Sequence, residues 1–289
     1  MSWRTITLAV VAIGCRPAAT GRAAVAIVDD AGDTVAVQVP ARRIASLIPA
    51  TTELLFAIGA GDRLVGRTAW CDFPPEAQLV DNLGDGINPN LEAILARNPD
   101  LVLLYNSAQH ASAAKRLRDL GIPTLRLSTD ALSDVDRLAK LFGRLTRHER
   151  RADSVSAVFD TALAAASSPP PGRRPKVLLL VWEQPPMTIG RGSFLNDLVE
   201  RAGGENVFAD VAASSGNVSI EAVAVRNPDL ILTTAAGPAA FANRPEWQVV
   251  PAVRERRFVH VKGSEFNRPS PRSPSAIRQL AGQLKALAR

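Results

Sequence analysis

One pattern of apolar and polar residues occurs twice along this chain. A helical pattern over Leu91–Arg97 ends at Asn98-Pro99-Asp100 and is followed by the apolar run Leu101–Leu103. The same pattern recurs, residue for residue in type, over Ile220–Leu232. Because proline restricts the residue before it and cannot continue a helix, each copy predicts a short helix followed by a buried strand. An internal repeat of this kind indicates two lobes built on one plan.

Further strand and helix patterns fit that plan in both halves. In the first half, the apolar run Ile44–Leu47 precedes a helix expected over Leu54–Ile58, which ends at Gly59. In the second, Val177–Val181 precedes a helix expected over Phe194–Arg201. Strands that alternate with helices at this spacing predict α/β lobes, each a mostly parallel sheet flanked by helices.

A helical segment is expected to join the lobes. Apolar residues keep helical spacing over 132–145, and Thr146-Arg-His-Glu149 has the sequence of a capping box, which predicts that a new helix starts there. The predicted divisions, in chain order, are a signal peptide (1–15), a hairpin (about 25–40), an N-terminal lobe (41–145), a long bridging helix (146–168), a Pro-rich linker (169–175) and a C-terminal lobe (176–289).

The first fifteen residues have the pattern of a secretory signal peptide. A short basic start precedes the apolar run Ile6–Ile13, which is too short to span a bilayer, and Gly14-Cys15 follows. We therefore expect the chain to be exported to the periplasm or the cell surface. The segment Ala12–Cys15 resembles a lipobox, so Cys15 is the candidate for a lipid that anchors the protein in a membrane. An ordinary signal peptide with an incidental cysteine, or a buried N-terminal strand, is the alternative.

Composition excludes some partners. The 289 residues are 46% hydrophobic and 21% charged, which suffices for a sizeable core, and the net charge is +6. Arginines are frequent between 137 and 151, but acidic residues interrupt them and no aromatic residues accompany them. We interpret them as solvated helix faces and expect no nucleic-acid partner. Cys71, the other cysteine, is expected to be a free, buried residue.

Several segments together resemble the class III substrate-binding proteins of bacterial ABC importers, in which two α/β lobes are joined by one helix. The matching segments are Arg43–Glu53, Asn98–Leu101, Gly192–Leu195 and Gly203–Phe208. Within that superfamily the chain is similar to the periplasmic cobalamin-binding proteins, through Trp70–Pro75, Leu91-Glu92, Gln184–Gly190, Val218–Glu221 and Phe266–Arg268. The resemblance implies a monomer, with no catalysis and no cofactor, that captures cobalamin or a related corrinoid between its lobes and delivers it to an ABC importer.

The resemblance also implies site residues. In that family an aromatic residue at the position of Trp70 packs on the corrin, one at the position of Tyr105 faces the cleft, and an arginine at the position of Arg268 lies at the cleft rim. The loops after Leu47, with Pro49, and after Val181 could add backbone groups.

Trp182 is the remaining candidate for a wall of the cleft. Each of these aromatic residues could instead pack only against its own lobe. Trp247, beside Pro245 and Glu246, is expected to be a surface anchor.

Glu92 and Glu221 occupy equivalent positions of the repeat, each early in a predicted helix. A carboxylate is favoured there by the helix dipole alone. In the resembled family, however, two glutamates at these positions pair with arginines of the two permease subunits. Two like charges related by pseudo-symmetry suit a two-fold partner, so we expect docking on the permease through this pair.

Four other functions remain as alternatives. A haem receptor of the same fold would need an axial ligand, for which Tyr105 and His110 are the local options. A siderophore receptor would need basic residues at the cleft, which Arg191, Arg268 and Arg272 could supply. The three histidines are far apart in sequence, which disfavours a zinc site and predicts no metal. An exported α/β enzyme is disfavoured because no nucleophile-elbow, phosphate-loop or metalloprotease motif is present.

Overall fold

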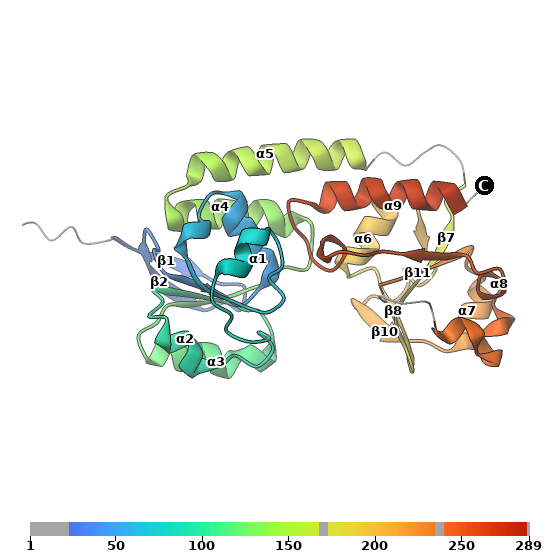
Figure 1. The fold of residues 1–289 in the computed structure, drawn as a ribbon, viewed down its shortest axis with the longest axis horizontal. Helices are drawn as coiled ribbons and strands as arrows, with labels where there is room; N and C mark the ends of the chain where they lie inside the picture. The colour runs from blue at the N-terminus through green and yellow to red at the C-terminus, as the bar shows by residue number, and fades with distance from the viewer. Residues whose placement is uncertain (1–22, 168–172, 235–239, 288–289) are drawn as a thin grey trace, which may run out of the picture.

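The computed structural model describes residues 23–167, 173–234 and 240–287. These residues form two α/β lobes that lie side by side and are joined along one face by helices (Figure 1). The predicted fold class is therefore confirmed. The signal peptide, Cys15 and most of the predicted linker lie outside the described residues.

The first lobe is built on a parallel sheet of four strands in the order β4-β3-β5-β6. The strands are β3 (Ile44–Ser46), β4 (Leu64–Arg67), β5 (Leu101–Tyr105) and β6 (Thr124–Leu127). Helices α1 (Pro49–Ala57) and α4 (Ser133–Thr146) cover one face, and α2 (Leu91–Ala96) and α3 (Ala108–Asp119) cover the other (Figure 1). Side chains alternate between the faces along β5, so Leu101 and Leu103 join one apolar cluster and Val102 and Leu104 another.

An antiparallel hairpin precedes this sheet. It consists of β1 (Ala23–Val28) and β2 (Thr34–Val39). The turn between them is held to the lobe by Asp29, whose carboxylate accepts the backbone N–H of Arg126 at 3.0 Å. This contact fixes the hairpin against the edge strand β6.

The second lobe has a mixed sheet of six strands. Its path is β10-β8-β7-β11-β12, and β9 also pairs with β7. The strands are β7 (Lys176–Glu183), β8 (Pro186–Ile189), β9 (Glu205–Asn206), β10 (Ser215–Asn217), β11 (Leu230–Thr233) and β12 (Phe258–His260). The flanking helices are α6 (Phe194–Arg201), α7 (Ile220–Arg226), α8 (Pro251–Arg254) and α9 (Ser273–Leu287). Here the strand β7 turns back into β8 before its helix begins, whereas β3 leads directly into α1.

The repeat seen in the sequence is a repeat in space. The copies form α2 followed by β5, and α7 followed by β11. Asn98 and Asn227 have the same left-handed backbone conformation, with φ of 44° in each. Asp100 and Asp229 then accept backbone N–H groups at the start of the neighbouring strand, from Arg43 at 2.8 Å and from Lys176 at 2.7 Å. The Asn-Pro-Asp motif thus ends a helix and aligns the next strand.

Helix α5 (Glu149–Ala166) packs against α4 of the first lobe and α9 of the second (Figure 1). The predicted capping box is wrong. Thr146 belongs to α4, where its hydroxyl donates to the carbonyl of Phe142 at 2.7 Å, and α5 follows His148 without a side-chain cap. No helix among the described residues is both long and apolar enough to span a membrane.

The structure tests the predictions made for Trp247 and Cys71. Trp247 is 1% exposed and packs on Phe241, with ring centroids 4.7 Å apart, so the prediction of a surface anchor is wrong. It fills the cluster beneath β7 and β11, because the short helix η4 (Pro245–Val249) turns its indole inward. Cys71 is a free, buried cysteine as predicted.

Candidate functional site

The lobes enclose two adjoining cavities, of about 860 and 570 Å³. Both are lined by Tyr105, Thr129, Asp130 and Asn267, so they adjoin at these residues and form one cleft. The larger cavity lies mainly against the first lobe and the smaller against the second. Cavities of this size are typical of sites for organic ligands.

Strand ends supply the first lobe's share of the cleft. The carboxyl ends of parallel strands meet at one sheet edge, which is where α/β sheets bind ligands. Here β3 leads to Pro49, β5 ends at Tyr105, and β6 is followed by Thr129 and Asp130. Helix α1 begins at Pro49. Proline has no backbone N–H, and at the first position of a helix this N–H would have no partner within the helix.

Tyr105 is hydrogen-bonded to a carboxylate where the two cavities adjoin. Its hydroxyl donates to Asp130 Oδ1 at 2.6 Å. Burial, and then the hydrogen bond and negative charge of Asp130, raise the pKa of the Tyr105 hydroxyl well above its ordinary value. Tyr105 is therefore a neutral donor in the physiological pH range.

Trp70 is an exposed aromatic residue that lines the larger cavity. Its side chain is 62% exposed, although its loop is well anchored. Cys71, directly after it, is buried, with its sulfur 3.2 Å from the Thr52 hydroxyl and 3.3 Å from the Thr68 hydroxyl. The backbone is thus fixed, while the indole projects into the cleft.

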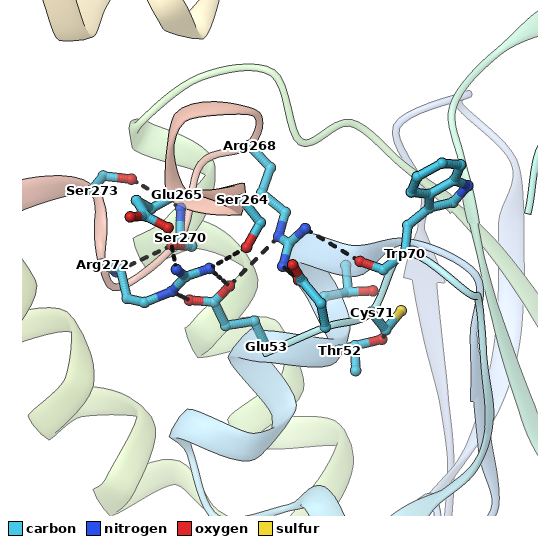
Figure 2. A network of polar contacts seen from close by, with 12 residues as sticks. Thr52, Glu53, Trp70, Cys71, Ser264, Glu265, Arg268, Ser270, Arg272 and Ser273 are labelled. Carbon is cyan, nitrogen blue, oxygen red and sulfur yellow. Dashed lines mark hydrogen bonds and ion pairs between the residues drawn. The ribbon is translucent and has the colours of Figure 1, made fainter. Parts of the chain in front are cut away.

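A network of ion pairs adjoins the larger cavity, which two of its members, Asp72 and Arg268, line. Figure 2 shows the network from close by. Arg272 donates to both oxygens of Glu53, at 2.7 and 2.9 Å, and Arg268 donates to Asp72 at 2.5 Å. Glu265 accepts from Arg272 at 2.6 Å. The arginines follow β12 of the second lobe and Glu53 and Asp72 belong to the first, so the network joins the lobes.

His110 connects three segments that line the larger cavity. It is buried, and its Nε2 lies 3.0 Å from the carbonyl of Gly86 and 3.1 Å from that of Ile87. Its Nδ1 lies 2.9 Å from the Tyr105 carbonyl and 3.1 Å from the Ser107 hydroxyl. Both ring nitrogens are engaged within the first lobe.

The cleft carries more negative than positive charge. Among the described residues that line the two cavities, the carboxylates are Asp72, Asp85 and Asp130, and the arginine is Arg268. Burial opposes ionisation of Asp72, but the hydrogen bond and charge of Arg268 outweigh it and lower the pKa of this carboxyl. Arg268 is thereby neutralised by its own neighbours.

Four predicted site residues come together in the larger cavity: Pro49, Trp70, Tyr105 and Arg268. Trp182 does not join them. It is 62% exposed, its indole N–H donates to the carbonyl of Gln184, and its neighbour Val181 lines the smaller cavity instead. Val181 and Trp182 are successive residues of β7, and successive side chains of a strand point to opposite faces, so the two do not share a face.

Several features of the cleft and its surroundings were not predicted from the sequence. Asp130 follows a strand, in the segment Ser128-Thr-Asp130. It could have been predicted, because residues after the carboxyl ends of parallel strands line ligand sites. Asn267 lies within a segment that was singled out only for its arginine. Glu53 and Arg272 are 219 residues apart, and nothing in the sequence pairs them.

The two repeat glutamates lie away from the cleft. Glu92 and Glu221 are exposed in the first turns of α2 and α7. These helices lie on the same side of the molecule, opposite α5 (Figure 1). Within the part of the chain that the structure describes, no group of three or more His, Cys, Asp or Glu side chains could hold a metal ion.

Comparisons with known proteins agree with this architecture. A family model described as periplasmic binding protein matches residues 44–265. The vitamin B12-binding protein of Pectobacterium carotovorum is 28% identical over 85% of this chain and 89% of its own. An uncharacterised ABC transporter substrate-binding lipoprotein of Bacillus subtilis is 30% identical over 88% of this chain and 83% of its own.

Solved structures give the same fold. The periplasmic vitamin B12-binding protein of Vibrio cholerae superposes with a TM-score of 0.70 and 26% identity, over 86% of this chain and 99% of that one. A periplasmic haem-binding protein of a Roseiflexus species has a TM-score of 0.77 at 24% identity, over 86% of this chain and 100% of that one. At this identity the second likeness speaks for the fold alone.

Proposed function

Because this chain belongs to the periplasmic binding protein family, we propose that it captures cobalamin or a related corrinoid in the cleft between its lobes and delivers it to an ABC importer. Proteins of this family are exported and bind a ligand for transport. The observation that carries the choice of ligand is the exposed indole of Trp70, which faces a cavity of about 860 Å³. Relatives named as vitamin B12-binding proteins support it.

The walls of the cleft suit a flat ring with an amide fringe. Trp70, Pro49 and Ile87 offer apolar surface on the first-lobe side of the larger cavity. Asn267, Gln109 and Arg268 offer polar groups that can pair with amides. A corrinoid presents both kinds of surface.

The charge of the cleft disfavours an anionic cargo. Asp72, Asp85 and Asp130 exceed the charge of Arg268, and Arg272 is already occupied by Glu53 and Glu265. Haem propionates and anionic ferric siderophores, such as the catecholates, would meet net repulsion there. A corrinoid with neutral amides would not.

The haem alternative also lacks a ready axial ligand in the described part of the cleft. Coordination of ferric iron by Tyr105 requires loss of its proton, which the hydrogen bond to Asp130 and burial oppose. His110 has both ring nitrogens engaged. For either residue, coordination would first have to break these contacts.

Delivery is proposed to use the exposed carboxylates Glu92 and Glu221 as the two contact points for the permease. Their exposure and common side of the molecule support this role. We propose in addition that a lipid on Cys15 holds the protein at the membrane, as a monomer. The likeness to a substrate-binding lipoprotein supports the anchor.

Calorimetric titration with cyanocobalamin tests the proposed function. We expect one saturable site, and we expect Trp70→Ala to weaken binding at least about tenfold, which corresponds to about 1.4 kcal/mol. Trp182→Ala is the matched control, because its indole is equally exposed and lies outside the two cavities. No saturable heat from folded protein, or equal loss in both variants, would contradict the proposal.

A further inference from the structure

The loop that carries Trp70 is held from the opposite lobe. Arg268 donates to the carbonyl of Trp70 at 3.4 Å and to the carboxylate of Asp72. The guanidinium of Arg272 lies 4.0 Å from the ring centroid of Phe73. Three of the four loop residues 70–73, Trp70 among them, therefore contact the segment that follows β12. Figure 2 shows the contact between Arg268 and Trp70.

We propose that Arg268 and Arg272 are positioning residues that place Trp70 for the ligand, so that this wall of the first lobe is built by the second lobe. The inference rests on the proposed function only in treating Trp70 as a ligand wall. It assigns the two arginines a role through Trp70, in addition to the polar group that Arg268 offers to the ligand at the cleft.

Several hydrogen bonds hold the guanidinium of Arg272 in place. It binds both oxygens of Glu53, whose side chain is 2% exposed, and it also contacts Glu265 and the Ser264 hydroxyl, at 3.0 Å. A guanidinium forms such a fork with a carboxylate, and an ammonium cannot reproduce it. Burial opposes the charge of Arg272, but the carboxylates of Glu53 and Glu265 raise its pKa, so it stays a cation.

Arg268 transmits this position to the loop. Its Nε lies 3.5 Å from Glu53 Oε2, to which Arg272 also donates at 2.9 Å. One buried carboxylate therefore orders both guanidinium groups. Asp72 is half exposed and reaches over from the loop to Arg268. Movement of the second lobe away from the first would remove these contacts together, and Trp70 would lose its support.

The second lobe offers a matched control. Arg226 binds both oxygens of Asp210, at 2.8 and 2.7 Å, and lies 4.2 Å from the ring centroid of Phe208. It repeats the fork and the cation–π contact of Arg272, but within one lobe and away from the cleft lining. Asp210 is 62% exposed and Glu53 is 2% exposed, so Arg226→Lys reports the effect of losing a fork near the surface, without any change at the lobe junction.

The first measurement uses no ligand. In a Trp182→Phe background, Trp70 is the exposed tryptophan of the described residues and Trp247 is buried. We expect Arg272→Lys to lower the fluorescence anisotropy of Trp70 and to raise its quenching by acrylamide, and Arg226→Lys to change neither. Equal behaviour of the two variants would overturn the inference.

The second measurement is cyanocobalamin affinity. If the loop is correctly placed about one tenth of the time, the apparent affinity falls about tenfold, which we expect for Arg272→Lys and not for Arg226→Lys. A change in anisotropy with no binding in any variant, wild type included, would refute the proposed function and leave the positioning role standing. Unchanged affinity in Arg272→Lys, with tight wild-type binding, would refute the positioning role alone.

A double variant separates positioning from stability. Arg272→Met alone removes both hydrogen bonds to the buried Glu53 and leaves it only the 3.5 Å contact with Arg268, which destabilises the fold. Replacing a buried pair by apolar residues is, in contrast, often tolerated. We expect Glu53→Leu/Arg272→Met to recover most of the melting temperature lost in Arg272→Met while Trp70 stays mobile. Recovery of both the melting temperature and the anisotropy would show that the pair is structural only.

Discussion

Tyr105 illustrates how a hydrogen bond limits what a side chain can bind. Its ring lines both cavities, but its hydroxyl is already a donor to Asp130. Its contribution to a corrinoid site is therefore the ring surface. Such surface is supplied equally well by phenylalanine.

Substitution of Tyr105 tests this assignment. We predict that Tyr105→Phe keeps cyanocobalamin affinity within about threefold, because the ring stays, and that Tyr105→Leu weakens it at least about tenfold. Calorimetry of both variants provides the comparison. A large loss in Tyr105→Phe would mean that the hydroxyl contacts the ligand.

The Asp72–Arg268 pair predicts a pH dependence. The pKa of Asp72 is lowered from 3.8, so the stabilisation that the pair provides is fully present above that value. It is lost as pH falls through the lower, folded-state pKa. We predict that the melting temperature of the wild type is higher than that of Asp72→Asn from about pH 5 to 7. We expect this difference in melting temperature to shrink below about pH 4. A difference that grows on acidification would contradict the ion pair.

At the scale of elements, the two helix-to-strand units share a strained residue. Asn98 and Asn227 are exposed and take a left-handed conformation that alanine adopts poorly and glycine adopts readily. We predict that alanine at either position lowers the free energy of unfolding by about 1 kcal/mol, and that glycine costs less. Urea unfolding of the four variants measures this. Equal effects of alanine and glycine would indicate that the side chain, not the backbone, matters.

The elements also show what the sequence could predict. The helix Phe194–Arg201 and both repeat units were predicted closely, because helix ends marked by Pro, Asn or Gly are local signals. The capping box failed, since Thr146 bonds back within α4, and a local motif does not reveal which helix owns it. Trp247 failed for a different reason, because burial depends on packing against Phe241 and β11, not on neighbours in sequence.

Part of the cleft could also be predicted from the sequence. Pro49 follows the end of a strand, and Trp70 and Tyr105 follow from the family resemblance, so these residues could be predicted. The contacts that join the lobes could not. Glu53 and Arg272 meet only because the segment after β12 crosses to α1, and no periodicity encodes that crossing.

At the scale of the molecule, the lobes share a continuous apolar core on the side of α5. Phe159 and Ala166 of α5 belong to the same cluster as Leu55 of α1 and Ile277 of α9. A hinge on this side would have to open packed surface. We therefore predict a small closure on binding, with a change in radius of gyration below about 1 Å by X-ray scattering. A larger decrease on adding cyanocobalamin would show that α5 permits a hinge motion.

Docking is also a property of the whole molecule, because Glu92 and Glu221 belong to different lobes. Glu92→Gln/Glu221→Gln should leave cyanocobalamin affinity within about twofold, since both side chains are outside the cleft. In proteoliposomes with the cognate permease, we predict a loss of uptake of at least about tenfold, as expected when two ion pairs are removed. Unchanged uptake would exclude these residues as the contact points.

Ligand choice is the central claim, and a competition measures it most directly. The mature protein is dialysed to equilibrium against equal concentrations of cyanocobalamin, hemin and a ferric hydroxamate siderophore, and the bound fraction is analysed by absorption spectra. We predict that the cobalamin spectrum accounts for the bound ligand at one equivalent per chain. Retention of hemin or of the siderophore in preference to cobalamin would contradict the account.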